Sequence, residues 1–323
     1  MARLGRSKKV ILAQPHGFCA GVRRAILIVE EALAKYGPPV YVRKEIVHNH
    51  YVVRSLRQRG AVFVASEDEV PEGAVCIFSA HGVSPAVRGN AAARRLDVID
   101  ATCPLVSKVH QEARRHARDG KTILLIGHAD HEEVEGTFGH APDRTIILDS
   151  VESVQRLTLA PDAAIGYLTQ TTLSLDETAG IVDALAERFP AMAGPAKGDI
   201  CYASQNRQNA VKAIAVRSDL VLVVGSNNSS NSIRMVEVAK DLGAPAYLVP
   251  DVTGLREEWL RDASVIGVSA GASAPEILVE QLLDRLAEHG YRDIEIERTA
   301  MENVVFGLPS SLAEHDSASA SAS

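Results

Sequence analysis

The sequence lacks the features that assign a chain to several common classes. No two cysteines are separated by two residues, so neither a zinc ribbon nor a thioredoxin-like redox motif is predicted. No apolar run approaches the roughly 20 residues that a membrane-spanning helix needs. The formal net charge is −7, which argues against the broad basic surface that binds nucleic acid. We therefore expect a protein that binds neither a membrane nor nucleic acid.

The amino terminus lacks the pattern of a secretory signal. Residues 1–9 are basic, but no signal-type apolar core and no small-residue cleavage site follow them. The chain has only 4 cysteines among 323 residues, which agrees with a reducing compartment. We expect a cytoplasmic protein with reduced thiols.

Short runs rich in Val, Ile and Leu alternate with amphipathic helical stretches along the chain. Continuous apolar strands separated by helices are typical of parallel sheets that are covered on both faces. The length exceeds that of a usual single core, so two or three domains are expected, with divisions close to Cys103 and Cys201. The clearest strand candidates are 8–14, 39–46, 61–65, 74–80, 97–101, 121–128, 145–149, 165–170, 220–226, 245–250 and 264–270.

Three of the four cysteines stand in the same local context. Cys19, Cys103 and Cys201 each follow an apolar strand-like run and precede a helical pattern. Open α/β sheets place their ligands at the carboxyl ends of strands, so three equivalent junctions indicate three similar α/β units around a centre. A helix N-terminus favours thiolate and therefore a metal or cluster ligand. The alternative is that each is a buried structural cysteine, as we expect for Cys76 inside GAVCIFSAHG.

Polar residues at two other predicted strand ends indicate an anion site. Ser229, Ser230 and Asn231 belong to a dense polar run between a strand and a helix, where backbone N–H groups bind phosphate well. Ser273 opens a second such junction, in which Pro275 and Glu276 also fit a capping box. The alternative for both segments is an ordinary helix cap.

Histidines follow three further apolar runs, at His48, His81 and 128–131. Together they are able to neutralise a diphosphate, although a lone histidine at such a place is more often structural. His128 and His131 with a nearby carboxylate leave a zinc site as an alternative, but no HExxH pattern is present. Thr171 lies at yet another strand end, where a hydroxyl-rich helix cap is the alternative.

Several long segments follow one another in a characteristic order. They are PHGFCAGVRRAI, VHNHYVV, FSAHGVSPAV, DATCPLVSKVH, GHADHEEVEGT, LTQTTLS, DICYASQNRQ, VVGSNNSSNS and SAGASAPEIL. In combination they resemble the LytB protein family, the 4-hydroxy-3-methylbut-2-enyl diphosphate reductases. The resemblance extends from about residue 10 to about residue 308.

This resemblance implies an α/β fold: a trefoil of three similar α/β units with parallel-type sheets around a central iron–sulfur cluster. The units are expected at 20–102, 103–197 and 198–308, the last completed by the N-terminal strand within 1–19. Residues 310–323 are rich in Ser and Ala and carry little apolar surface, so a disordered tail is predicted.

The resemblance also implies the cofactor and the site. One [4Fe–4S] cluster per chain is expected on Cys19, Cys103 and Cys201, with the fourth iron open to substrate, whereas most such clusters have four thiolate ligands. The expected catalytic residues are Glu133 as proton donor, Thr171 beside it, and His131. The expected substrate-binding residues are His48, His81, His131, Thr171, Ser229, Ser230, Asn231 and Ser273.

One position departs from the family pattern. The family often has proline where this chain has Glu132. A carboxylate there would alter the pKa of Glu133 if it pointed inward, but we expect it to face solvent.

The implied activity is a two-electron reductive dehydroxylation. It converts 4-hydroxy-3-methylbut-2-enyl diphosphate to isopentenyl and dimethylallyl diphosphate, the last step of the methylerythritol phosphate isoprenoid pathway. No GxGxxG fingerprint follows a strand, so we expect electrons from a separate ferredoxin or flavodoxin with its NADPH-dependent reductase. The alternatives are an iron–sulfur sensor protein without enzymatic activity and a zinc-dependent phosphohydrolase that uses His128 and His131.

Overall fold

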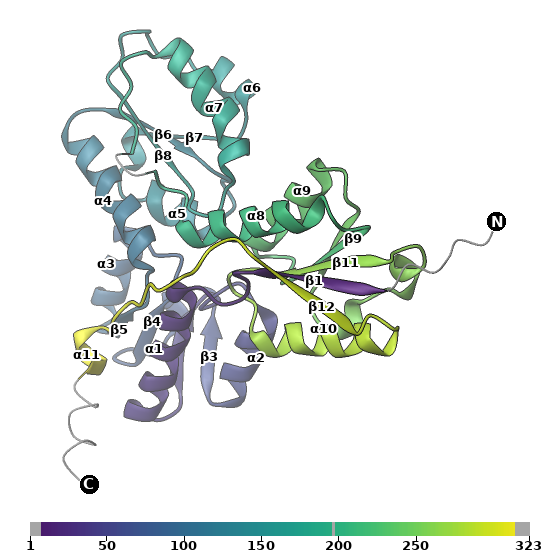
Figure 1. Cartoon of the computed structure of the whole chain (residues 1–323). Helices are drawn as coiled ribbons and strands as arrows, with labels where there is room; N and C mark the ends of the chain where they lie inside the picture. Colours follow the sequence, from purple (N-terminus) through teal and green to yellow (C-terminus); the bar gives the residue numbers. More distant parts are fainter. Residues whose placement is uncertain (1–7, 196–197, 314–323) are drawn as a thin grey trace. The chain divides into compact units, whose positions relative to one another are not determined.

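The computed structural model describes residues 8–195 and 198–313, which form two compact units that interleave along the sequence (Figure 1). The first, here called the five-stranded unit, contains the residues up to Cys19, the segment His48–His50 and Tyr202–Val304. The second, here called the two-sheet unit, contains Ala20–Val47, Tyr51–Cys201 and the residues from Val305 onward. The chain thus passes from one unit to the other directly after Cys19 and again directly after Cys201.

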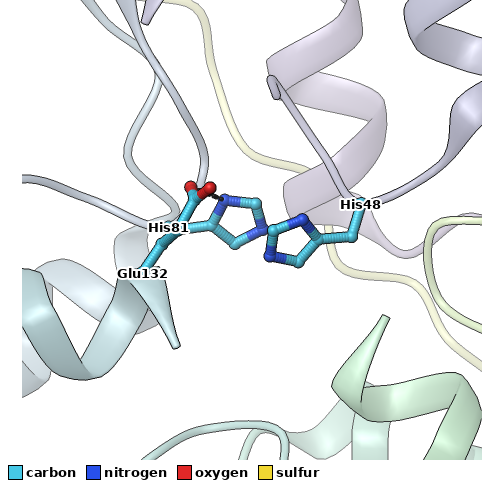
Figure 2. Close-up of side chains that lie close together, drawn as sticks. All are labelled: His48, His81 and Glu132. Atoms are coloured by element: carbon cyan, nitrogen blue, oxygen red, sulfur yellow. Dashed lines mark hydrogen bonds and ion pairs between the residues drawn. The ribbon is translucent and has the colours of Figure 1, made fainter. Parts of the chain in front are cut away.

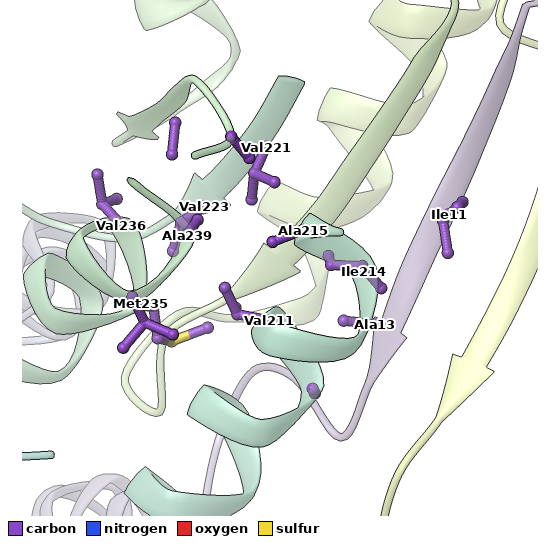
Figure 3. Packing of buried hydrophobic residues seen from close by; sticks show 14 residues of the cluster. Ile11, Ala13, Val211, Ile214, Ala215, Val221, Val223, Met235, Val236 and Ala239 are labelled. Atoms are coloured by element: carbon purple, nitrogen blue, oxygen red, sulfur yellow. The ribbon is translucent and has the colours of Figure 1, made fainter. Parts of the chain in front are cut away.

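The five-stranded unit is built on one parallel sheet with the order β10-β9-β11-β1-β12. Its helices carry apolar faces that pack on the sheet, and Figure 3 shows this core between β1, α8 and α9, with Ile11, Ile214 and Met235 fully buried. The strands are β1 (Lys9–Gln14), β9 (Leu220–Val224), β10 (Ala246–Val249), β11 (Val265–Ala270) and β12 (Asp293–Arg298). The helices are α8 (Tyr202–Ala215), α9 (Ser230–Asp241) and α10 (Glu276–Glu288), with short 3₁₀ turns at Val252–Gly254 and Glu257–Leu260.

Strand β12 was not among the strands predicted from the sequence. It pairs with β1 in register from Lys9↔Asp293 to Gln14↔Arg298 and forms one edge of the sheet. Its Glu295 pairs with Lys9 at 2.8 Å and with Arg217, and its Glu297 also pairs with Arg217. Edge strands commonly carry such charges, and the charges remove the continuous apolar run by which the other strands were recognised.

The two-sheet unit contains two smaller parallel sheets, with the orders β3-β2-β4-β5 and β7-β6-β8. The first sheet consists of β2 (Val40–Arg43), β3 (Ala61–Val64), β4 (Val75–Phe78) and β5 (Asp97–Asp100), with α1 (Ala20–Tyr36), α2 (His50–Gln58), η1 (Glu67–Glu69) and α3 (Pro85–Ala93). The second consists of β6 (Thr122–Ile126), β7 (Thr145–Leu148) and β8 (Ile165–Thr169), with α4 (Pro104–Arg118), α5 (Glu132–Phe138), η2 (Pro142–Arg144), α6 (Val151–Gln155) and α7 (Leu175–Arg188).

The predicted fold class is confirmed at the level of an α/β fold with three parallel sheets. Every strand expected from the apolar runs is present, and all observed strand pairs are parallel. Strands β2–β5 lie inside 20–102, β6–β8 inside 103–197, and the five-stranded sheet takes the remainder with β1. The division into three domains with those boundaries stays a prediction.

The predicted disordered tail begins too early. Residues Ser310–Ala313, which were assigned to it, form the short helix α11. Leu312 is buried and Lys35 Nζ donates a hydrogen bond to the Ser311 carbonyl at 2.7 Å, so this turn is fixed by contacts that the composition does not reveal. The rest of the predicted tail, 314–323, lies outside the described residues. Among the helices that are described, none has the length and hydropathy needed to cross a membrane.

Candidate active site

In the two-sheet unit, Cys103 lies at the carboxyl end of β5 and forms the N-cap of α4. Pro104 occupies the first turn of that helix, where its fixed φ suits a helix start. The Cys103 N–H donates to the Ala80 carbonyl at 3.0 Å, which ties the cysteine to the loop that carries His81. Arg24 Nη1 donates to the carbonyls of Ala101 and Thr102 at 3.3 and 3.2 Å. The backbone before the thiol is therefore held from two sides.

Glu133 is joined to Cys201 through a single residue, Thr171. The Thr171 N–H donates to Glu133 Oε1 at 2.6 Å, and its hydroxyl donates to Oε2 at 3.0 Å. The Thr171 carbonyl in turn accepts the N–H of Cys201 at 2.9 Å. Glu133 is only 2% exposed, so this carboxyl group is withdrawn from water and oriented at both oxygens. Such an arrangement suits a group that delivers a proton at a fixed point.

His131 forms the N-cap of α5 and is held in one tautomer. Its Nδ1 accepts a hydrogen bond from the Glu133 N–H at 3.2 Å. An accepting Nδ1 carries no proton, so Nε2 carries it in the neutral ring. The predicted site residues His131, Glu133 and Thr171 are thus brought together by β6, α5 and the end of β8.

The structure corrects the prediction that Glu132 faces solvent. Its Oε2 lies 3.1 Å from His81 Nδ1, and the side chains of His81 and Glu132 are only 14% and 19% exposed. The dashed line in Figure 2 marks this contact. Ser79 Oγ lies 3.3 Å from the same nitrogen. The partner of Glu132 is the His81 imidazole, which is distant in the sequence and was therefore not considered. Glu135, three residues later, is the residue that faces outward, and it pairs with Lys44 at 2.6 Å.

A buried carboxylate that sequence reasoning missed supports the loop before Cys201. Asp199 Oδ2 accepts the Thr169 N–H at 3.1 Å, and its Oδ1 lies 3.3 Å from Lys108 Nζ on α4. Burial raises the pKa of Asp199, and the hydrogen bond from Thr169 and the charge of Lys108 oppose this shift. The only sequence signal for this contact is an acidic residue two positions before Cys201.

In the five-stranded unit, Cys19 follows β1 and is fixed by the loop after β11. Its N–H donates to the Ala272 carbonyl at 3.1 Å. Gly17 has a φ of +69°, a conformation that other residues rarely adopt, and its N–H donates to the Ala270 carbonyl at 3.1 Å. Arg207 donates two hydrogen bonds to the Gly17 carbonyl, from Nε at 3.0 Å and from Nη2 at 2.6 Å.

Arg207 is itself held by an ion pair that the sequence analysis did not identify. The guanidinium is 1% exposed and its Nη1 lies 2.9 Å from Glu302 Oε1. A second contact joins Nη2 to Oε2 at 3.3 Å. These two contacts with Glu302 fix the buried guanidinium of Arg207. The guanidinium in turn holds the turn before Cys19 through its hydrogen bonds to the Gly17 carbonyl.

The same unit gathers the predicted diphosphate-binding residues. Ser229 forms the N-cap of α9, and its Oγ lies 3.5 Å from Ser273 Oγ. Asn231 Oδ1 accepts the Ala272 N–H at 2.9 Å. Its Nδ2 is buried, and the described residues offer it no hydrogen-bond partner, so a donor is left for a ligand. Ser230 is half-buried at the first position of α9.

The His48 segment belongs to this cluster of hydroxyl groups. Ser273 Oγ donates to the His48 carbonyl at 2.9 Å. Two residues later, the His50 N–H donates to Ser226 Oγ at 3.2 Å. The segment His48–His50 is therefore hydrogen-bonded to the loops that follow β9 and β11. These are the two loops in which phosphate donors were predicted.

One cysteine, Cys76, is a core residue as predicted, and the other three are partly exposed. Cys76 is fully buried, and desolvation raises its pKa to about 12, which makes it a poor ligand. Cys19, Cys103 and Cys201 are partly exposed, and none of the described cysteines forms a disulfide. Soft thiolate sulfurs at strand ends are the donors that iron–sulfur clusters require, so the residues fit such a group.

The zinc alternative receives no support from the described part of the chain. There, His128 and His131 do not belong to any set of three or more side chains whose potential ligand atoms lie within 4.8 Å of one another. Instead, the His128 N–H donates to Gln170 Oε1 at 3.1 Å, and His131 Nδ1 is occupied by the cap of α5.

Comparison with known proteins identifies close relatives over nearly the whole chain. The family model described as LytB protein matches residues 10–287. A 4-hydroxy-3-methylbut-2-enyl diphosphate reductase of Nocardia farcinica is 58% identical and aligns with 95% of this chain and 91% of its own length. The protein of that name from Rhodococcus opacus is 56% identical, with coverages of 96% and 93%.

Two solved structures are similar to this fold. The first is the E-1-hydroxy-2-methyl-but-2-enyl-4-diphosphate reductase of Plasmodium falciparum, with a TM-score of 0.94, 38% identity, and coverages of 97% of this chain and 99% of that one. The second is a structure of (E)-4-hydroxy-3-methyl-but-2-enyl diphosphate reductase, described as the terminal enzyme of the non-mevalonate pathway. Its TM-score is 0.63 at 31% identity, with coverages of 87% and 99%.

Proposed function

This chain belongs to the LytB protein family, and we propose that it is a 4-hydroxy-3-methylbut-2-enyl diphosphate reductase, the terminal enzyme of the non-mevalonate isoprenoid pathway. The observation that carries the proposal is the link from Glu133 through Thr171 to Cys201. It sets a buried carboxyl group, the expected proton donor, one residue away from an expected cluster ligand.

The expected cofactor is one [4Fe–4S] cluster, held by Cys19, Cys103 and Cys201 within a trefoil of α/β units. When bound, it supplies two electrons and a Lewis-acidic iron for the hydroxyl group of the substrate. The partial exposure of these three thiols and the fixed backbone before each of them support this assignment. The deeply buried Cys76 has no part in it.

Substrate binding is assigned to the diphosphate end of an allylic alcohol. In the five-stranded unit, Ser229, Ser230, Asn231 and Ser273 offer hydroxyl and amide donors at the N-terminus of α9 and in the neighbouring loop. Neutral donors and the helix N-terminus stabilise an anion without a large basic surface. His48, His81 and His131 complete the expected pocket, and these contacts orient the hydroxyl group for reduction.

The chemistry assigned to the protein is the delivery of protons. Hydroxide is a poor leaving group, so Glu133 protonates the hydroxyl oxygen as the C–O bond breaks and water departs. Overall, the substrate takes up two electrons and two protons and releases one water. The second proton goes to carbon at either end of the allylic system, which gives isopentenyl or dimethylallyl diphosphate. Thr171 holds Glu133 at both oxygens and so fixes the point of proton transfer.

The electrons are assigned to a separate carrier, a ferredoxin or flavodoxin with an NADPH-dependent reductase. The absence of a GxGxxG fingerprint after a strand supports this, because the chain then has no expected dinucleotide site of its own.

Anaerobic purification followed by turnover tests the function. The expected result is a brown protein with iron and acid-labile sulfide that converts the substrate to the two diphosphate products when reduced viologen is supplied. A clustered protein that binds no substrate and yields no product would instead indicate an iron–sulfur sensor. A colourless protein that contains zinc and releases phosphate would indicate a hydrolase.

A further inference from the structure

The contact between Glu132 and His81 adds a residue to the expected site that neither the sequence patterns nor the comparisons assign. Glu132 is the first residue of α5, and His81 follows the strand β4. Both side chains are largely withdrawn from solvent, and the 3.1 Å distance between Oε2 and Nδ1 is that of a direct hydrogen bond. Figure 2 shows the carboxylate and the ring facing each other.

A carboxylate next to one ring nitrogen determines what the other nitrogen offers. A carboxylate accepts only, so Nδ1 must carry the proton of this hydrogen bond. In a neutral ring, Nε2 would then be an acceptor, and it would repel the oxygens of a diphosphate. The negative charge of Glu132 favours the imidazolium, in which Nε2 also carries a proton.

We propose that Glu132 is a positioning residue that holds His81 as an imidazolium, with Nε2–H presented to the substrate diphosphate. The inference rests on the proposed function, because it takes His81 as a diphosphate ligand. The Glu132–His81 pair adds no net charge to the site, but its positive end faces the ligand. The carboxylate is shielded by the ring, so attraction to the near charge outweighs repulsion from the far one.

Glu135 provides a matched control on the same helix. It lies three residues after Glu132 and carries the same charge, but it is 54% exposed and pairs with Lys44 and Arg43. Glu135→Gln therefore removes one carboxylate from α5 without touching His81. Any general effect of charge on α5 appears equally in both variants.

The test measures binding of inorganic diphosphate to the anaerobic holoenzyme by calorimetry. Glu132→Gln should weaken binding about tenfold, since a charge-assisted hydrogen bond is replaced by a neutral one. Glu135→Gln should leave binding within about twofold of the parent, as for an exposed pair. In turnover, Glu132→Gln should raise KM by a similar factor and keep kcat, because the residue acts on the binding of the diphosphate.

A double-mutant cycle distinguishes action through His81 from a general structural role. In a His81→Ala background, Glu132→Gln should no longer weaken binding, because the ring through which it acts is gone. The same loss in both backgrounds, or tighter binding in Glu132→Gln alone, would overturn the proposal. A parent enzyme that neither binds diphosphate nor reduces the substrate would overturn the proposed function as well. Normal binding and turnover in Glu132→Gln would overturn only the role of Glu132.

Discussion

Both carboxylate oxygens of Glu133 are occupied by one residue, Thr171, at 2.6 and 3.0 Å. A buried carboxyl group held at both oxygens has a fixed direction for its remaining proton. The same residue accepts the N–H of Cys201, so movement of the cysteine loop would be transmitted to Glu133, the proposed proton donor.

Glu133→Gln should therefore block proton delivery while substrate binding survives. Loss of a positioned general acid typically lowers the rate by about 10²–10⁴-fold. The measurement is single-turnover product formation by the reduced enzyme, with Glu132→Gln assayed at saturating substrate as the comparison. Normal turnover in Glu133→Gln together with an inactive Glu132→Gln would instead assign the proton donor to Glu132.

Replacement of Cys19, Cys103 or Cys201 by Ser should abolish activity and sharply reduce bound iron, because a hard hydroxyl replaces a soft thiolate. Cys76→Ser should keep its iron and lose about 1–3 kcal/mol of stability, because a hydroxyl would be buried there without an assured partner. Iron and sulfide analysis of the four purified variants checks this. Full iron content in any of the first three would remove that cysteine from the ligand set.

Asn231→Asp should weaken diphosphate binding by at least about tenfold. The amide donor Nδ2 is replaced by a carboxylate oxygen, whose negative charge repels the diphosphate. The substitution keeps the oxygen that accepts the Ala272 N–H, so the local fold is retained. It replaces the buried Nδ2, for which the described residues supply no partner, by a second carboxylate oxygen. Asn227→Asp, at an exposed position of the same loop, is the control for added charge. Equal binding by both variants would contradict the assignment of Asn231.

Arg207→Met should destabilise the protein and lower its iron content, although it touches no thiol. Breaking a buried ion pair typically costs about 3–5 kcal/mol, and here the change also frees the Gly17 carbonyl before Cys19. Thermal unfolding and iron analysis measure the two effects. If the melting temperature falls while iron remains stoichiometric, then Arg207 supports the fold and not the cysteine turn.

Acid should destabilise the two-sheet unit through His110 and His140. Burial lowers the pKa of His110 to about 3, and burial with the nearby charge of Arg114 lowers that of His140 to about 4. Both stay neutral in the folded protein while their unfolded forms gain protons below about pH 6.5. Stability is thus unaffected above that pH and falls as the pH drops towards 4, by up to about 1.4 kcal/mol per pH unit for the buried His110 and by less for the partly exposed His140, where solvent screens the charges.

His110→Phe tests the assignment of this pH dependence. The ring remains, and no hydrogen bond is lost at Nε2, which lacks a partner among the described residues. Urea unfolding followed between pH 7 and pH 4.5 should give a shallower decline for this variant than for the parent. Parallel curves would show that His110 does not take up a proton on unfolding.

The sequence predicts most of this fold because parallel strands are buried on both faces and so appear as continuous apolar runs. Strand β12 was not predicted because, as an edge strand, it alternates acidic and apolar residues and has no continuous apolar run. Position in the sequence also places Thr171, Asn231 and Ser273 after predicted strands, since parallel topology places strand ends on one edge of a sheet. The role of Glu133 follows only from the family resemblance and stays a prediction.

What the sequence does not predict is the pairing of distant charges. Arg207 and Glu302 are 95 positions apart, and no local pattern marks either as buried. Glu132 was expected in solvent because its partner His81 lies 51 positions away. Both contacts depend on which loops the fold brings together, and helix periodicity carries no information about that.

The strand order has a consequence for the synthesis of the chain. Strand β1 leaves the ribosome first, yet its two partners, β11 and β12, end at Ala270 and Arg298. The amide contacts of Cys103 and Cys201 involve only residues 80–201, so they are available much earlier. Domains begin to fold as they emerge from the ribosome. The backbone contacts of Cys103 and Cys201 are therefore able to form while β1, which precedes Cys19, still lacks its partner strands. Assembly of the proposed cluster on all three thiols is thereby deferred until β11 and β12 have been synthesised.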